Sequence, residues 1–175
     1  MLEPNPMCQP TLDYLFGRNE KAEVVVTAVG QKPGLVTLYT HGTDSTASVD
    51  PAWDRQVYGS KARKLSAITV PIITLDFLIS HYGRPDFLKI DVEGFEVSVL
   101  EGLSTKVPLL SFEFHARTID RTEKCFNLLN KLGKLSMRAS NMNCEWLMQK
   151  TSNLNDCLLT LRGSNMAGDM FVWLD

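Results

Sequence analysis

Four side chains able to move a proton lie at or just beyond the ends of two apolar runs. Asp91 closes the run 86–90 and Glu93 follows it, while Glu113 and His115 end the run 108–115. Carboxylates and imidazoles are common general bases in enzymes. Each of these residues alone is as compatible with a helix cap or a solvated surface group. Their combination favours a functional site.

These residues meet only if the apolar runs form neighbouring parallel strands. β-branched and apolar stretches predict strands, and apolar residues at helical spacing predict the helices between them. The expected strands cover residues 24–29, 35–40, 68–73, 86–91, 108–115, 135–139, 145–148 and 170–174. The expected helices cover residues 12–16, 75–79 after an N-cap at Thr74, 95–103, 118–132 with Gly133 as its stop, and 154–161.

Alternation of strands and helices predicts parallel pairing through right-handed crossovers. We therefore expect one domain, residues 1–175, with an α/β three-layer sandwich. The carboxyl ends of its parallel strands bind ligands, and Glu3 would join the other acidic residues there. Residues 41–66 are polar and irregular, which favours disorder or plain surface over a substrate lid.

Composition narrows the class of protein further. The 175 residues are 44% hydrophobic and carry a formal net charge of -2, which suits one core and does not favour nucleic-acid binding. No apolar run reaches the roughly 18 residues of a membrane span, and the N-terminus has no signal-peptide pattern. The four cysteines form no Cys-x-x-Cys pair, which disfavours a zinc or redox motif. We expect a cytoplasmic protein with free thiols.

A specific block surrounds Asp91. Lys89-Ile90-Asp91-Val92-Glu93-Gly94-Phe95-Glu96, followed by Val99-Leu100-Glu101-Gly102, resembles the signature of FkbM-type S-adenosylmethionine-dependent methyltransferases. Further segments are similar to that family along nearly the whole chain. They comprise residues 3–6, 28–30, 35–39, 70–78 and 168–171.

The resemblance implies a Rossmann-like three-layer sandwich of the class I methyltransferase type, with S-adenosyl-L-methionine as the cofactor. It places Glu3 on the cofactor's ribose hydroxyls, with Asn5 in the same cofactor-binding segment, and Ala28 and Val29 beside the adenine. Asp91 would face both the methionine end of the cofactor and the acceptor hydroxyl. The remaining acceptor-side residues would be Glu93, Glu113 and His115.

The implied reaction is O-methylation of a small hydroxylated acceptor, such as a sugar or a polyketide-like molecule. Asp91 is the first candidate for the general base and His115 the second, with Glu113 beside them. A divalent metal on Asp91, Glu113 and His115 is chemically possible. No ligand spacing demands it, so we expect no metal. The sequence does not indicate an oligomeric state.

The front of the chain departs from the family pattern. A fold of this type places a glycine-rich turn roughly 20 residues before the ribose-binding acid, which here is residue 3. We therefore expect the first strand, the first helix and the glycine turn to be absent, leaving strand edges unpaired. Two alternatives follow: a fragment of a complete methyltransferase, or an inactive binding module or partial chain completed by a partner. In either case this chain alone should bind the cofactor weakly or not at all.

Overall fold

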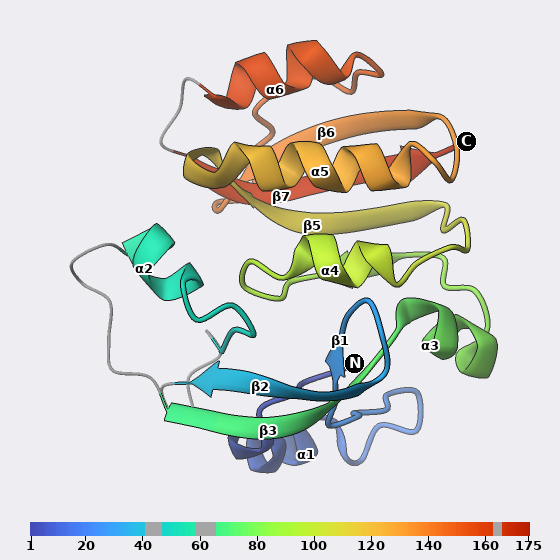
Figure 1. Cartoon of the computed structure of the whole chain (residues 1–175). Helices are drawn as coiled ribbons and strands as arrows, with labels where there is room; N and C mark the ends of the chain where they lie inside the picture. Colours follow the sequence, from blue (N-terminus) through green and yellow to red (C-terminus); the bar gives the residue numbers. More distant parts are fainter. Residues whose placement is uncertain (41–46, 59–65, 163–165) are drawn as a thin grey trace.

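The fold is a mixed α/β arrangement with two separate sheets (Figure 1). It is known from a computed structural model that describes residues 1–40, 47–58, 66–162 and 166–175. Within the described residues, no helix is long and apolar enough to cross a membrane.

The elements follow the chain in mostly alternating order. The strands are β1 (Ala28–Val29), β2 (Gly34–Thr40), β3 (Ser66–Ile73), β4 (Leu88–Ile90), β5 (Leu109–His115), β6 (Leu135–Asn141) and β7 (Ala167–Leu174). The α-helices are α1 (Gln9–Phe16), α2 (Trp53–Tyr58), α3 (Leu75–Tyr82), α4 (Glu96–Glu101), α5 (Ile119–Leu129) and α6 (Leu154–Arg162). The 3-10 helices in the described part of the chain are η1 (Pro6–Cys8) and η3 (Ala116–Thr118).

The larger sheet has the strand order β4-β5-β7-β6. β4 runs parallel to β5, whereas β7 is antiparallel to both β5 and β6. Helices α4 and α5 lie over one face of this sheet (Figure 1). Alternate residues of β5 point into the core beneath them, where Leu110, Phe112 and Phe114 are buried and Phe126 of α5 packs edge-on against Phe112.

The smaller sheet has the order β1-β3-β2 and a much smaller core. β1 is parallel to β3, and β2 pairs antiparallel with β3 over its whole length. Leu38, Val70 and Ile72 are buried on one face of these strands, where Ala47 and Val49 pack against them. Phe95, just before α4, packs against both cores and links them.

Several local predictions are confirmed. Thr74 is the N-cap of α3, where its hydroxyl accepts the Phe77 backbone N–H at 3.1 Å. Strands form near the predicted positions at 35–40, 68–73, 108–115, 135–139 and 170–174. The four cysteines are free thiols.

Other local predictions are wrong. The run 24–29 is a strand only at Ala28–Val29, with a single parallel bridge between Val25 and Leu2 before it. Residues 145–148 form only an isolated bridge, from Trp146 to Ser140. Helix α5 ends at Leu129, so Gly133 is not its stop. The three residues before Gly133 form a tighter turn, with the Leu132 N–H bonded to the Leu129 carbonyl.

The expected continuous parallel sheet is also absent from the described strands. Only β1 with β3 and β4 with β5 are parallel among the strand pairs. β4 is an end strand of one sheet and β1 an end strand of the other. An apolar run predicts a strand but does not indicate which other strand it pairs with. The sequence pattern therefore could not show that the strands form two separate sheets.

Candidate functional site

The candidate site lies where the parallel strands β4 and β5 end. Leu88 pairs with Leu110, and continuing this register sets Asp91, just after β4, level with Glu113. Glu113 and His115 are two residues apart on β5, so their side chains share a face of the sheet. The structure thus brings these predicted residues together at one edge.

A strained turn positions Glu93 beside them. Glu93 has a φ of 50° and Gly94 a φ of 91°, so both lie in the left-handed region. The Ser48 hydroxyl donates to the Glu93 carbonyl at 2.6 Å. Gly94 tolerates this conformation, and a Cβ there would overlap the Trp53 ring. The local backbone therefore turns the Glu93 carboxylate toward the strand ends.

Trp53 covers this turn and was missed by the sequence analysis. Its side chain is 3% exposed, and its indole N–H donates to Glu93 Oε2 at 2.8 Å. Its ring meets the His115 ring edge-on, with centroids 5.0 Å apart. Helix α2, which begins at Trp53, contacts η3, which directly follows β5. The sequence signal that could have revealed Trp53 is a single tryptophan within the largely polar residues 41–66.

The prediction of disorder or plain surface for residues 41–66 is therefore wrong for the described part. Residues 47–58 pack against the strand ends through Trp53 and Ser48. Residues 41–46 and 59–65 lie outside the described residues, and the prediction is not assessed for them.

Arg121, on α5, binds residues 50–56, here called the Trp53 segment, and the turn at Gly94. Its guanidinium donates to the Gly94 carbonyl, to Asp50 Oδ2 at 2.6 Å and to Gln56 Oε1 at 2.9 Å. It also lies 5.3 Å from the centroid of the Trp53 ring. One side chain thus connects α5, the glycine turn and the two ends of the Trp53 segment. Sequence spacing offered no signal for Arg121.

Glu113 and His115 form a pair that is mostly screened from solvent. His115 Nε2 lies 3.2 Å from Glu113 Oε1, and their side chains are 17% and 14% exposed. Among the described residues, Glu113 Oε2 is buried without a hydrogen-bond partner. A buried acceptor without a donor is costly, which makes it a point where a ligand donor would be favoured.

Three carboxylates approach one another closely enough for a cation. One oxygen each of Asp91, Glu93 and Glu113 lies within 4.8 Å of the others. Hard oxygen ligands of this kind suit Mg²⁺, Ca²⁺ or Mn²⁺. The set differs from the combination weighed from sequence, because Glu93 takes the place of His115. The expectation that no metal takes part stays a prediction.

Burial sets the protonation of two nearby acids. Desolvation raises the pKa of Glu93, and the charges of Glu113 and Asp91 raise it further, whereas the Trp53 hydrogen bond lowers it. Desolvation also raises the pKa of Glu96, at the start of α4, to about 7. The Glu96 carboxylate accepts the Gly94 N–H at 3.0 Å, so its charge state bears on the strained turn.

Lys89 and Asp169 lie next to Asp91. Lys89 Nζ lies 3.5 Å from Asp91 Oδ2 and 3.1 Å from Asp169 Oδ1. Partial burial lowers the pKa of Lys89, but the hydrogen bond and charge of Asp169 and the charge of Asp91 raise it overall. Half of the Asp91 side chain remains exposed, so it is reachable from solvent.

The predicted cofactor residues form a second group around the smaller sheet. Asn5 is buried, accepts the Met7 N–H at 3.1 Å as the cap of η1, and donates to Thr40 Oγ1 at 3.2 Å. Ala28 and Val29 are buried core residues, 4% and 8% exposed. No described hydrogen bond or ion pair joins this group to Asp91. Their roles toward a cofactor stay predictions.

Glu3 has the chemistry that a ribose-binding acid needs. Its Oε1 accepts the Asn5 backbone N–H at 2.7 Å, and no described residue donates to Oε2. Desolvation raises the pKa of Glu3, and the Asn5 hydrogen bond partly offsets this. The fixed carboxylate with one unused oxygen fits two ribose hydroxyls.

Comparison with models of protein families shows which family the chain belongs to. Residues 1–136 match the model of the Methyltransferase FkbM domain. The chain belongs to the FkbM methyltransferase family. The FkbM match ends within β6, so the likeness predicted for residues 168–171 lies outside it. No curated protein and no solved structure matches the chain.

Proposed function

We propose that this FkbM-family chain is an S-adenosyl-L-methionine-dependent methyltransferase that methylates a hydroxyl group of a small acceptor. The observation that carries the proposal is the meeting of Asp91, Glu93, Glu113 and His115 at the ends of β4 and β5 under Trp53. A sugar or polyketide-like molecule offers the hydroxyl groups that such a polar edge binds.

The cofactor assignment rests on family membership and on Glu3. S-adenosyl-L-methionine supplies a methyl group carried on a sulfonium cation. Glu3 Oε2 would accept from the ribose hydroxyls, with Asn5 holding the Glu3 segment against β2. Ala28 and Val29 would offer an apolar wall to the adenine. This arrangement belongs to a Rossmann-like class I fold, of which the described sheets would be two parts.

On the acceptor side, Asp91 is the general base that takes the hydroxyl proton. It is the carboxylate most open to solvent in the cluster, so an incoming acceptor reaches it directly. Positioned proton transfer of this kind contributes about 10²–10⁴-fold in rate. His115 is the second candidate for this base. The unpartnered Glu113 Oε2 and Glu93 would accept further acceptor hydroxyls, and the buried Trp53 would hold the Glu93 carboxylate in position through its indole N–H.

The test measures transfer of tritiated methyl groups with protein in excess over labelled cofactor. The acceptor panel holds sugars, glycosides and hydroxylated polyketides, and each product is treated with mild alkali. A methyl ether survives this treatment and a methyl ester does not, so hydroxyl and carboxyl acceptors are distinguished. Binding of the labelled cofactor is measured separately by equilibrium dialysis up to millimolar concentration, because we expect weak binding.

Asp91→Asn is the decisive variant, and Asp156→Asn on α6 is its matched control. We expect Asp91→Asn to slow alkali-stable transfer by at least about 100-fold with little change in cofactor binding. Asp156→Asn should behave as the unaltered chain. Equal rates in all three proteins would remove Asp91 as the base. Absence of transfer at cofactor concentrations where binding is detected would contradict the methyltransferase proposal.

A further inference from the structure

Three side chains outside the strained turn at Glu93 and Gly94 bond to its backbone. The Ser48 hydroxyl donates to the Glu93 carbonyl at 2.6 Å. The Arg121 guanidinium donates to the Gly94 carbonyl, and the Glu96 carboxylate accepts the Gly94 N–H at 3.0 Å. A left-handed conformation at a residue other than glycine is strained and persists only where its surroundings hold it. Because Glu93 has a φ of 50°, its position depends on these side chains.

Arg121 joins this turn to the Trp53 segment. It donates to Asp50 Oδ2 at 2.6 Å and to Gln56 Oε1 at 2.9 Å. Asp50 in turn shapes the start of α2, because its Oδ1 accepts the Ala52 N–H at 2.9 Å and its carbonyl accepts the Trp53 N–H at 3.1 Å. The Trp53 segment is therefore held against α5 by the side chain of Arg121.

The Trp53 segment also holds the Glu93 carboxylate. The Trp53 indole N–H donates to Glu93 Oε2 at 2.8 Å, and Glu93 belongs to the carboxylate cluster with Asp91 and Glu113. Arg121 thus acts on Glu93 twice, through the backbone of the turn and through Trp53. No described hydrogen bond or ion pair joins Arg121 directly to the three carboxylates of that cluster.

The pairing of Arg121 with Asp50 makes Arg121 difficult to replace. Their side chains are 26% and 23% exposed, so the pair is mostly screened from water. Removal of one partner from such a pair leaves an uncompensated charge. A lysine would keep the charge, but its single ammonium group lacks the planar fork that reaches Asp50, Gln56 and the Gly94 carbonyl together.

A hollow of 430 Å³ lies beside Arg121. Its lining includes Asp50 and Gly94, to which Arg121 bonds, and also Ser98 and Lys124. Lys124 is exposed, and no described hydrogen bond or ion pair joins it to Asp50 or Gly94. The hollow therefore gives a small ion access to the groups that Arg121 binds. It also contains a second cation that does not bind them.

We propose that Arg121 is a positioning residue of the acceptor site. It holds the Gly94 turn and the Trp53 segment together, and thereby keeps the Glu93 carboxylate beside Asp91. This role rests on the proposed function, because it gives Glu93 a contact with the acceptor. A contact with a hydroxyl that does not react stabilises the bound acceptor and the transition state alike. Loss of Arg121 should therefore raise the KM of the acceptor and leave kcat nearly unchanged.

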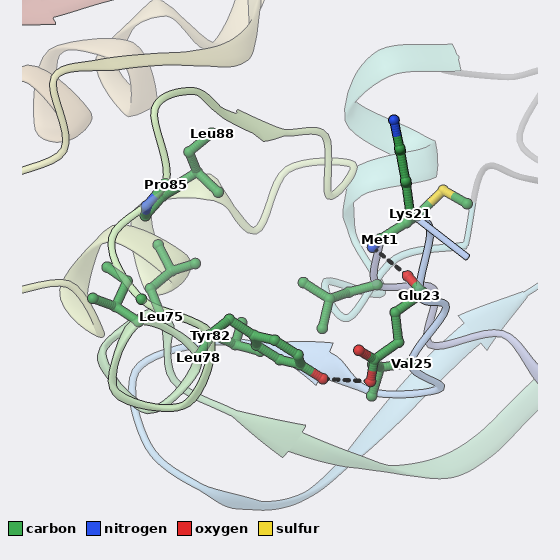
Figure 2. A pocket seen from close by; sticks show the side chains of 12 residues that line it. Met1, Lys21, Glu23, Val25, Leu75, Leu78, Tyr82, Pro85 and Leu88 are labelled. Carbon is green, nitrogen blue, oxygen red and sulfur yellow. Dashed lines mark hydrogen bonds between the residues drawn. The ribbon is translucent and has the colours of Figure 1, made fainter. Parts of the chain in front are cut away.

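The first test compares Arg121→Ala with two controls, using the acceptor of the sugar, glycoside and polyketide panel that gives the highest rate. Arg121→Ala should raise the acceptor KM at least tenfold, with kcat within about twofold and cofactor binding unchanged. Lys124→Gln removes a positive charge from the same hollow and should have no effect. Tyr82→Phe is the remote control, because the Tyr82 hydroxyl donates to Glu23 at 2.6 Å in a groove whose described lining residues are not those of the hollow (Figure 2).

Guanidinium ion distinguishes a positioning role from a general loss of stability. At concentrations well below those that unfold proteins, it should lower the acceptor KM of Arg121→Ala at least threefold, because it can enter the hollow in place of the missing group. Urea has a similar shape without the charge and should not do so.

Asp50→Asn is a second variant, and it keeps the proposal testable if Arg121→Ala fails to fold. The asparagine retains an oxygen for the Ala52 N–H but loses the charge that pairs with Arg121. It should raise the acceptor KM in the same way by a smaller factor. Guanidinium should not reverse this effect, because Arg121 is still present.

Trp53 reports the same role without methyl transfer. Its buried ring should become accessible to acrylamide quenching in Arg121→Ala and stay protected in Lys124→Gln, with the Trp53→Phe version of each protein subtracted. Guanidinium should restore the protection. The amides of residues 50–56 should exchange hydrogen for deuterium faster in Arg121→Ala, with little change in β7.

An unchanged acceptor KM in Arg121→Ala would overturn the proposal and leave the proposed function standing. A Trp53 ring that stays protected without Arg121 would overturn it as well, as would equal effects of urea and guanidinium. Absence of transfer by the unaltered chain, at cofactor concentrations where binding is detected, would overturn both the proposed function and this role.

Discussion

The two sheets differ in how firmly they are anchored. The four-stranded sheet buries three phenylalanines, Phe112, Phe114 and Phe126, in a core that reaches from α4 to α6. Among the described residues, the three-stranded sheet buries only Ala28, Leu38, Val70 and Ile72 in its own core. Apolar burial is the main source of folding free energy. The larger sheet should therefore open far less often than the smaller one.

The proposed site is divided between these unequal regions. Asp91, Glu113 and the covering Trp53 are held by the larger sheet and by Arg121 of α5. Glu3 and Asn5 are attached to the smaller one. Precise geometry thus lies on the acceptor side, where proton transfer requires it. The cofactor side depends on the smaller core.

The strongest test of the unequal cores is Phe126→Ala. Because Phe126 is fully buried against Phe112, its truncation should cost about 3–5 kcal/mol of unfolding free energy. Ile72→Val in the smaller core should cost only about 0.5–1.5 kcal/mol, and Phe77→Ala, 56% exposed, less. Urea unfolding measures all three. The contrast fails if Phe126→Ala costs no more than Ile72→Val, or if β2 amides exchange as slowly as β5 amides.

The next effect is a pH dependence due to Glu96. Because desolvation raises its folded pKa to about 7, the folded state binds its proton more tightly than the unfolded state. The stability it contributes is present below its unfolded pKa near 4.5 and is lost as pH rises to about 7. This shift corresponds to roughly 3 kcal/mol. Glu96→Gln should flatten the curve between those pH values; an unchanged slope would show that Glu96 is not its source.

A smaller effect is expected at the turn that joins site and core. Gly94→Ala should lower stability by about 1–3 kcal/mol, because Gly94 has a φ of 91° and an added Cβ meets the Trp53 ring. Displacement of that ring should also change the tryptophan emission. Trp53→Phe is the control, because it identifies the part of the emission that belongs to Trp53. Unchanged stability and emission in Gly94→Ala would show that this turn does not require glycine at position 94.

The smallest effect concerns the cofactor side. Glu3→Gln replaces a charged acceptor, so S-adenosyl-L-methionine affinity should fall roughly tenfold, or about 1.4 kcal/mol. The rate at saturating cofactor should stay the same, because the proposal gives Glu3 a role in cofactor binding and none in proton transfer. Glu20→Gln, at an exposed position, serves as the control. Equilibrium dialysis and single-turnover transfer separate the two quantities. A fall in rate without a fall in affinity would contradict the division of the site.

The local patterns were readable because their causes are local. Thr74 caps α3 through its own hydroxyl, and the apolar runs at β3 and β5 form strands where expected. The block around Asp91 identified the FkbM family, and the family match confirms it. The parallel pairing of β4 with β5 also followed from the strand–helix–strand order. These features need only neighbouring residues to be specified.

The remaining features needed contacts between distant residues. Trp53 reaches Glu93 across 40 positions, and Arg121 reaches Asp50 across 71. The run 24–29 is apolar enough for a longer strand, yet pairing with Leu2 and with β3 limits it to short contacts. Strand formation depends on partners as much as on propensity. Sequence spacing carries no information about such partners.

The sequence by itself determined the family, the alternation of elements and the acidic strand ends, because periodicity and a contiguous motif encode them. Tertiary structure alone decided that the sheet divides, that Trp53 and Arg121 cover the cluster, and that side chains from distant elements hold the turn at Gly94. The physical reason is that burial and hydrogen-bond partnership are properties of the packed chain. The motif around Asp91 identified this residue as a candidate, whereas the side chains that surround it were identified only in the folded structure.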